Sequence, residues 1–137
     1  MGVETSILSW ILADTTITSA LDSEQVYWHR VPDEALLPWI VVSIRPMGRR
    51  DNITQSFTDV IVNIEVDCEH ELPFAGRALA ELVLRRLDNF RGDLTDIDDV
   101  HIRCKPPYPL DGYSGSYCYR VEGTVRYKEA RTEPPAS

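Results

Sequence analysis

The clearest pattern in the chain is an alternation of apolar and polar residues from residue 57 to residue 68. One set of alternate positions is apolar: Val60, Val62, Ile64, Val66 and Cys68. The other set, interrupted only by Ile61, is polar: Asp59, Asn63, Glu65 and Asp67. Side chains two residues apart share a face of a strand, so the pattern predicts a long strand with one buried and one polar face. A slip of one residue would bury the carboxylates, so the register is strongly specified.

A helical pattern follows, over residues 72–90. Its apolar residues recur every three or four positions and form a stripe that has Leu87 at its edge and otherwise comprises Ala75, Leu79, Leu82, Val83 and Phe90. We expect the segment from Glu69 to Glu71, with its two acidic residues, and Pro73 to begin this helix and Gly92 to end it. Arg86 projects beside the stripe. We expect it either to extend towards solvent or to meet an acidic partner in another subunit.

Shorter periodic segments surround these two elements. Residues 5–13 have helical spacing, and Asp14 supplies a cap for a second short helix, so a broken helix is expected. Trp10 lies beside the apolar face of the first helix and is either a core residue or a subunit contact. Further strands are predicted at residues 26–31, 39–45, 100–105 and 116–127.

This order of elements predicts the α+β class, with an antiparallel sheet of about five strands and two main helices packed on one face. A chain of 137 residues is of single-domain size. We expect one domain over residues 1–130. Residues 131–137, which contain two prolines, are expected to form a disordered tail.

Periodicity is lost between residues 46 and 56, where we expect a loop between two strands. The segment contains Met47, the basic pair Arg49 and Arg50, and then Asp51 and Asn52. Two interpretations are open. The segment is either a solvated hairpin tip or a binding loop whose arginines face phosphate or the carboxylates of a neighbouring subunit.

The charge balance is acidic, with 22 acidic and 14 basic residues and a net charge of −8. This balance argues against a sequence-independent grip on the phosphate backbone, which needs clustered Lys and Arg. An acidic protein can nevertheless line a conduit through which DNA slides without sticking. No apolar run approaches the roughly 20 residues that span a bilayer. A soluble, intracellular protein with no membrane contact is expected.

The residues offer no signature of catalysis, and we expect neither a cofactor nor a metal. Cys68, Cys104 and Cys118 are odd in number and widely spaced, so we expect them to be reduced and semi-buried. Residues 67–71 hold three acids, a cysteine and a histidine, but neighbours in a strand alternate faces and cannot converge on one ion. His29 lacks companions at ligand spacing and is interpreted as an ordinary strand histidine.

Several short motifs occur in a recognisable order. They are Leu37-Pro38-Trp39 at a strand start, Gly48-Arg49-Arg50-Asp51, a strand ending Val66-Asp67-Cys68, and an Ala- and Leu-rich helix ending Leu87-Asp88-Asn89-Phe90-Arg91-Gly92. Together they resemble the tail completion or tail terminator proteins of long-tailed bacteriophages, over residues 5–128. The chain departs from that family at Glu69-His70-Glu71, where small residues and an aromatic are common.

The resemblance implies a structural virion protein that forms a ring, a hexamer, at the head-proximal end of a tail tube. Such a ring would end tube polymerisation and join the tail to the head and neck. It would assemble in the host cytoplasm. Its partners would be other copies of the chain, the tail tube protein and a neck or head-completion protein. DNA would pass through it without specific binding.

The interface residues expected on this basis are Met47, Arg49, Arg50, Asp51, Asn52, Glu65, Asp67, Arg86, Arg120 and Arg126. Glu65 and Asp67 with Arg120 and Arg126 are hypothesised to make charge contacts between subunits, and residues 47–55 to reach the tail-tube ring or the neck.

Two other functions are open. The first is a head-completion or neck adaptor protein, which would stay monomeric until it joins a ring. The second is a small intracellular enzyme or ligand-binding protein, which as an enzyme would lose activity when His29 or His70 is changed to Ala.

Overall fold

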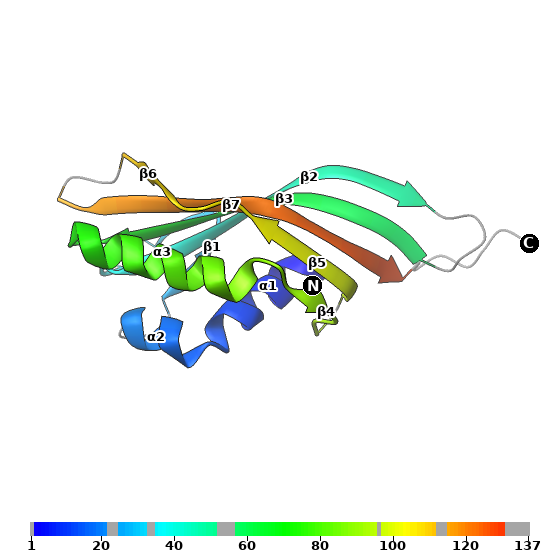
Figure 1. The fold of residues 1–137 in the computed structure, drawn as a ribbon, viewed down its shortest axis with the longest axis horizontal. Coiled ribbons are helices and arrows are strands. Elements are labelled where there is room, and N and C mark those ends of the chain that lie inside the picture. The colour runs from blue at the N-terminus through cyan, green and yellow to red at the C-terminus, as the bar shows by residue number, and fades with distance from the viewer. Residues whose placement is uncertain are drawn as a thin grey trace, which may run out of the picture.

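The computed structural model describes residues 2–21, 25–32, 35–51, 57–95, 97–111 and 115–130. In these residues a seven-stranded sheet has three helices packed on one of its faces (Figure 1). The elements are α1 (Val3–Leu12), α2 (Thr15–Leu21), β1 (Val26–Trp28), β2 (Trp39–Asp51), β3 (Phe57–His70), α3 (Pro73–Leu87), β4 (Arg91–Gly92), β5 (Asp98–Cys104), β6 (Tyr108–Leu110) and β7 (Tyr117–Ala130).

The sheet order is β1-β2-β3-β7-β5-β4, and β6 pairs with the first part of β7. The predicted α+β class is confirmed, although the sheet is mixed because β1 runs parallel to β2. It has more strands than the expected five because β4 and β6, which were not predicted, are only two and three residues long. Strands this short leave little periodic signal, and the strand expected at residues 26–31 ends at Trp28.

The alternation in β3 does direct its apolar residues into the core. Val66 lies between Val42 of β2 and Val121 of β7, and all three are buried. Helix α3 covers this face of β3 and β7 (Figure 1). Gly76 is buried where the helix meets β7, and a Cβ there would lie 3.4 Å from the carbonyl oxygen of Tyr117.

The loop expected from residue 46 is a wrong prediction, because β2 continues to Asp51. Pro46 lies opposite Val62 and Gly48 opposite Ile61, so Met47 is an extra residue that forms a β-bulge. The long partner strand β3 provides the pairing that local proline and glycine signals did not predict. Proline is compatible with this position because β1 pairs only with residues 40–42, which leaves the later part of β2 without a described partner on that side. Residues 52–56, which complete the predicted loop, lie outside the described residues.

Helix α3 begins at Pro73, as predicted, but ends at Leu87 and not at Gly92. Asn89 has a left-handed backbone with φ 63°. Its amide donates to the carbonyl of Ile102, which redirects the chain into the pairing of β4 with β5. Leu87 was expected at the edge of the apolar stripe but is fully buried. The buried face of the helix is turned relative to the predicted stripe: it comprises Gly76, Leu79, Ala80, Val83 and Leu87, whereas Ala75 and Leu82 are half-buried.

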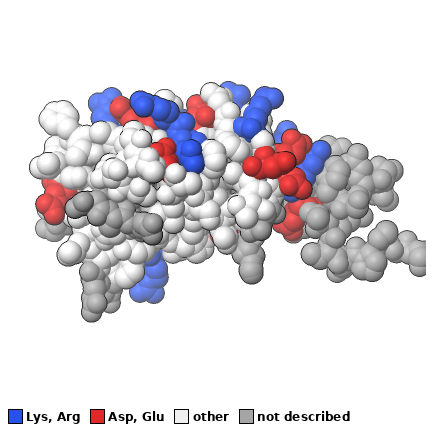
Figure 2. Space-filling model, turned by 90° about the horizontal axis from the view of Figure 1, so that it is seen from below, with Lys and Arg blue, Asp and Glu red and all other residues white. Residues whose placement is uncertain are grey.

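The predicted break between the first two helices is confirmed. The carboxylate of Asp14 accepts hydrogen bonds from the amides of Thr16 at 2.9 Å and Ile17 at 3.4 Å, which caps α2. Charged side chains are sparse in these two helices: α1 has Glu4 alone and α2 has none. Figure 2 shows that the middle of this helical face is largely uncharged, while charges gather along its rim. No described helix is both long and apolar enough to cross a membrane.

Candidate functional site

Three of the expected interface residues form one ionic network on the sheet face that the helices leave open. Arg120 of β7 lies opposite Asp67 of β3. Its Nε and Nη2 donate to the two carboxylate oxygens of Asp67 at 2.7 Å and 3.0 Å. Its Nη1 donates to Oε2 of Glu65 at 2.9 Å, and Arg45 of β2 lies 3.5 Å from the other oxygen of Glu65.

The strand geometry explains this network. Glu65 and Asp67 are two residues apart on β3, so both carboxylates point to the same face. The planar guanidinium of Arg120 then meets Asp67 in a bidentate pair and still reaches Glu65. The hydrogen bond to Asp67 raises the pKa of Arg120; burial opposes this effect, and the charges of Asp67 and Glu65 reinforce it. Arg120 is therefore a permanent cation that holds two carboxylates in fixed positions.

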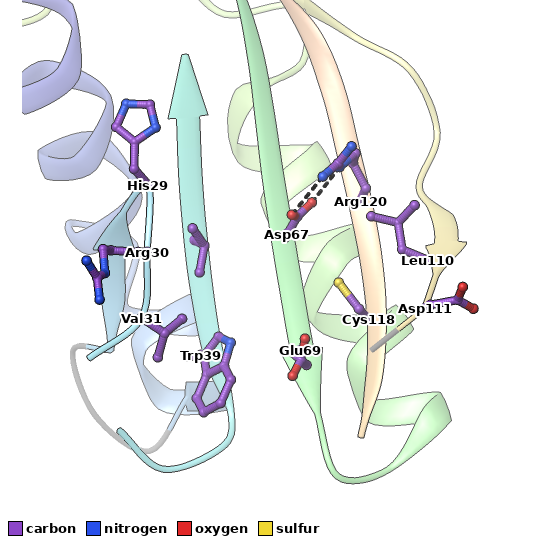
Figure 3. A pocket seen from close by; sticks show the side chains of 11 residues that line it. His29, Arg30, Val31, Trp39, Asp67, Glu69, Leu110, Asp111, Cys118 and Arg120 are labelled. Carbon is purple, nitrogen blue, oxygen red and sulfur yellow. Dashed lines mark hydrogen bonds and ion pairs between the residues drawn. The ribbon is translucent and has the colours of Figure 1, made fainter. Parts of the chain in front are cut away.

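Beside this network, a cavity of about 580 Å³ lies over the end of the sheet (Figure 3). Its floor comes from three neighbouring strands, with Trp39 of β2, Glu69 of β3 and Cys118 of β7 in one cross-strand row. The segment 29–31 after β1 borders one side, and residues 110–111 border the other. Its volume is in the range of small-molecule and side-chain binding pockets.

Glu69 was expected to help begin α3, and this prediction is wrong. It is the penultimate residue of β3, is only 5% exposed, and accepts a hydrogen bond from the hydroxyl of Ser116 at 2.9 Å. The alternation that places Glu65 and Asp67 on the open face extends to Glu69. The two-residue alternation therefore already indicated that Glu69 belongs to the strand. The acidic residues before Pro73 instead favoured the interpretation as a helix start.

The three cysteines are free thiols, as predicted, with Cys68 and Cys118 buried. Burial raises the pKa of Cys118 to about 12; the charges of Asp67 and Glu69 add to this effect, and that of Arg120 opposes it. Burial also raises the pKa of Cys68 and, to about 12, that of Cys104. The reactive thiolate form is therefore suppressed at neutral pH.

Two of the three histidines, His29 and His70, contact neighbouring residues of the chain. His29 follows β1 with a left-handed backbone of φ 64°, is exposed, and packs against Trp28 with 4.4 Å between ring centres. His70 Nδ1 accepts a hydrogen bond from the amide of Leu72 at 3.1 Å. Among the described residues, no three His, Cys, Asp or Glu side chains are grouped as metal ligands.

The other expected interface residues do not join the network. Arg86 contacts Trp10 and Asp14 within the chain, which connects α3 to α1. Arg126 is exposed on β7, six residues beyond Arg120. Met47 is exposed at the bulge of β2, and Arg49, Arg50 and Asp51 complete that strand. Asn52 lies outside the described residues.

Comparison with solved structures identifies a similar fold. One match is a chain from a structure described as the virion of a native gene transfer agent particle, at 15% sequence identity and a TM-score of 0.64. The similarity covers 92% of this chain and 92% of that chain. No protein-family model and no curated protein sequence matches this chain.

Proposed function

We propose that this protein is a structural subunit of a phage-like virion. The observation that carries the proposal is the likeness over 92% of both chains to a protein of a gene transfer agent virion. It agrees with the resemblance of the sequence motifs to phage tail completion and tail terminator proteins. The role is one of assembly, and no step of chemistry is assigned to the site residues.

The proposal extends to a ring, with six copies, at the head-proximal end of the tail tube. The ring stops tube polymerisation and connects the tube to the neck. The open face of the sheet supports this role because Arg120, Glu65 and Asp67 form a rigid charged surface that can face a neighbouring subunit or the channel. The net charge of −8 favours passage of DNA without adhesion. In the same scheme, residues 47–55 extend towards the tail-tube ring or the neck.

Sedimentation velocity and negative-stain electron microscopy on the purified chain test the ring. We expect association that increases with concentration, and closed rings with sixfold symmetry in the images. A protein that stays monomeric at millimolar concentration contradicts the ring. A neck adaptor would be monomeric when purified by itself and would join a ring only when a partner is added.

A second experiment tests the position of the ring. The protein is added to a polymerising tail tube protein, and tube lengths and ends are measured by electron microscopy. We expect shorter tubes with extra density at one end. Tubes of unchanged length with bare ends would contradict the terminator role, whatever the oligomeric state of the free protein.

A further inference from the structure

Glu69 is a buried carboxylate at the floor of the cavity on the open face of the sheet. Its Oε2 accepts a hydrogen bond from the hydroxyl of Ser116, and the thiol of Cys118 donates a second hydrogen bond to its carboxylate. Both partners are uncharged, and in the described part of the chain no lysine, arginine or histidine forms an ion pair with Glu69. Burying a carboxylate without a cation is costly, so a cation that enters the cavity gains a strong electrostatic partner.

The other charged groups around the cavity offset one another. The lining contains three acidic and three basic residues: Asp67, Glu69 and Asp111 with His29, Arg30 and Arg120. Arg120 binds both oxygens of Asp67, so this pair adds no net charge to the floor. At the rim, Arg30 and Asp111 have opposite charges, and both are exposed to solvent, as is His29. The carboxylate of Glu69 therefore remains without a counter-charge among the groups that line the cavity.

The thiol of Cys118 indicates the sign of the potential at the floor. Burial is the main reason why its pKa is raised to about 12. The charges of Asp67 and Glu69 raise this pKa further, and the charge of Arg120 lowers it by less. The floor of the cavity therefore has a negative potential, which attracts a cation and opposes a phosphate or carboxylate ligand.

Trp39 supplies the second part of a cation site. It lies directly opposite Glu69 in the pairing of β2 with β3, and both side chains line the cavity (Figure 3). Opposite residues of neighbouring strands have Cβ atoms about 5 Å apart, so an organic cation on the indole is within reach of the carboxylate. Aromatic rings and carboxylates both attract such cations. Val41 and Leu110 add apolar surface for the carbon chain that carries the charge.

We propose that this cavity binds a lysine or arginine side chain of a neighbouring protein in the virion, with the charged head at Glu69 and the carbon stem on Trp39. The proposal rests on the virion role proposed above and names the chemistry of a partner. The volume of about 580 Å³ is in the range of pockets for drug-sized ligands, so the cavity accommodates the side chain together with its adjoining backbone.

A nuclear magnetic resonance titration of the full chain tests the site. The probes are Nα-acetyl-arginine methylamide and its neutral analogue Nα-acetyl-citrulline methylamide, which has nearly the same shape. We expect the arginine probe to shift the indole signal of Trp39, assigned with Trp39→Phe, and to bind at least about tenfold more tightly than the citrulline probe. Equal affinities, or no shift of Trp39 with the arginine probe, would overturn the proposal. A shift caused by inorganic phosphate would also overturn it, because the cavity would then be an anion site.

Glu69→Gln removes the charge but keeps the shape of the side chain, and the glutamine can still accept the hydrogen bond from Ser116. We expect this variant to fold, as checked by circular dichroism, and to bind the arginine probe at least about tenfold more weakly. The matched control is Asp111→Asn, which removes a carboxylate from the exposed rim and should change the affinity by less than about threefold. Equal losses in the two variants would contradict a site built on Glu69.

Arg30→Gln tests the sign of the site without altering its floor. Arg30 is exposed at the rim, so this variant should fold even if Glu69→Gln does not. A cation site should bind the arginine probe equally or more tightly once this positive charge is removed. Weaker binding would show that Arg30 holds the ligand and would overturn the proposal.

The source of the cation is tested with the partners of the proposed function. Wild type and Glu69→Gln are compared for binding to the ends of tail tubes and to a purified neck protein. We expect the variant to need at least about tenfold more protein for half-maximal binding to one of the two. Equal binding to both, by a variant that no longer binds the arginine probe, would assign the cavity to a free amine and overturn the partner side chain. A wild-type chain that binds the probe but neither partner would contradict the proposed function and leave the cation site standing.

Discussion

Trp10 and Arg86 donate hydrogen bonds to each other's backbone. The indole Nε1 of Trp10 donates to the carbonyl of Arg86 at 3.1 Å, and Nε of Arg86 donates to the carbonyl of Trp10 at 2.9 Å. The guanidinium carbon lies 3.5 Å from the centre of the Trp10 ring, whose other neighbour is Phe90 at 4.8 Å between ring centres. This reciprocal pair attaches α1 to α3, so both residues have partners inside the chain.

Replacing Arg86 with lysine should test this attachment. Lysine keeps the positive charge but loses the planar group that both stacks on Trp10 and donates through Nε. We expect a loss of about 1–2 kcal/mol in the free energy of unfolding, measured by urea denaturation followed by circular dichroism. Arg85→Lys is the control, because Arg85 is exposed on the same helix turn. Equal losses in the two variants would show that the contact to Trp10 contributes nothing.

Arg120→Met should destabilise the fold, because it leaves the carboxylates of Glu65 and Asp67 side by side without their cation. The pair is partly solvated, so we expect about 1–3 kcal/mol and not the larger cost of a fully buried charge. A double-mutant cycle with Asp67→Asn isolates the pair, and we expect a coupling of about 1–2 kcal/mol. Arg126→Met, on the same strand but outside the network, should change stability by less than about 0.5 kcal/mol. Additive effects of Arg120→Met and Asp67→Asn would be inconsistent with the network.

Gly123→Ala should weaken the pairing of β5 with β7. A Cβ at Gly123 would lie 2.8 Å from Sγ and 2.9 Å from Cα of Cys104, and closer still to the carbonyl oxygen of Arg103. The two strands would have to separate, which we expect to lower the midpoint of thermal unfolding and to cost about 2–3 kcal/mol. Gly48→Ala is the matched control, since nothing lies within 4 Å of its added Cβ. Two variants with the same midpoint would contradict the crowding at Gly123.

Stability should fall in alkaline solution because of the thiols. The pKa of Cys104 is raised from about 9 to about 12 by burial and, to a lesser extent, by the charge of Asp88. Above pH 9 the unfolded chain releases this proton while the folded chain keeps it, so the free energy of unfolding decreases as pH rises towards 12. One such thiol contributes a slope of up to about 1.4 kcal/mol per pH unit.

The variant Cys104→Ser, whose hydroxyl does not titrate in this range, isolates the contribution of that thiol. Urea denaturation at several pH values between 8 and 11 should give a shallower decline for the variant than for the wild type. Titration of lysines and tyrosines is common to both proteins and cancels in the comparison. Parallel declines would show that the thiol of Cys104 ionises normally in the folded protein.

The sequence by itself determined the elements whose signal is local. The alternation from Val60 to Cys68 defines β3 and its two faces, because side chains two residues apart on a strand always share a face. The helical stripe with Pro73 defines the start of α3, and Asp14 marks the break before α2. Each of these follows from residues within a few positions of one another.

Tertiary structure decided the features that depend on distant partners. Strand β2 continues through Pro46 because β3 pairs with it, and α3 ends at Leu87 because Asn89 bonds to Ile102. Arg120 meets Asp67 across 53 positions of sequence, a pairing that exists only once the register of β3 and β7 is set. Glu69 likewise reaches the floor of the cavity only because β3 continues to His70, close to the start of α3. Local periodicity specifies which face a side chain occupies, whereas strand pairing specifies what it meets there.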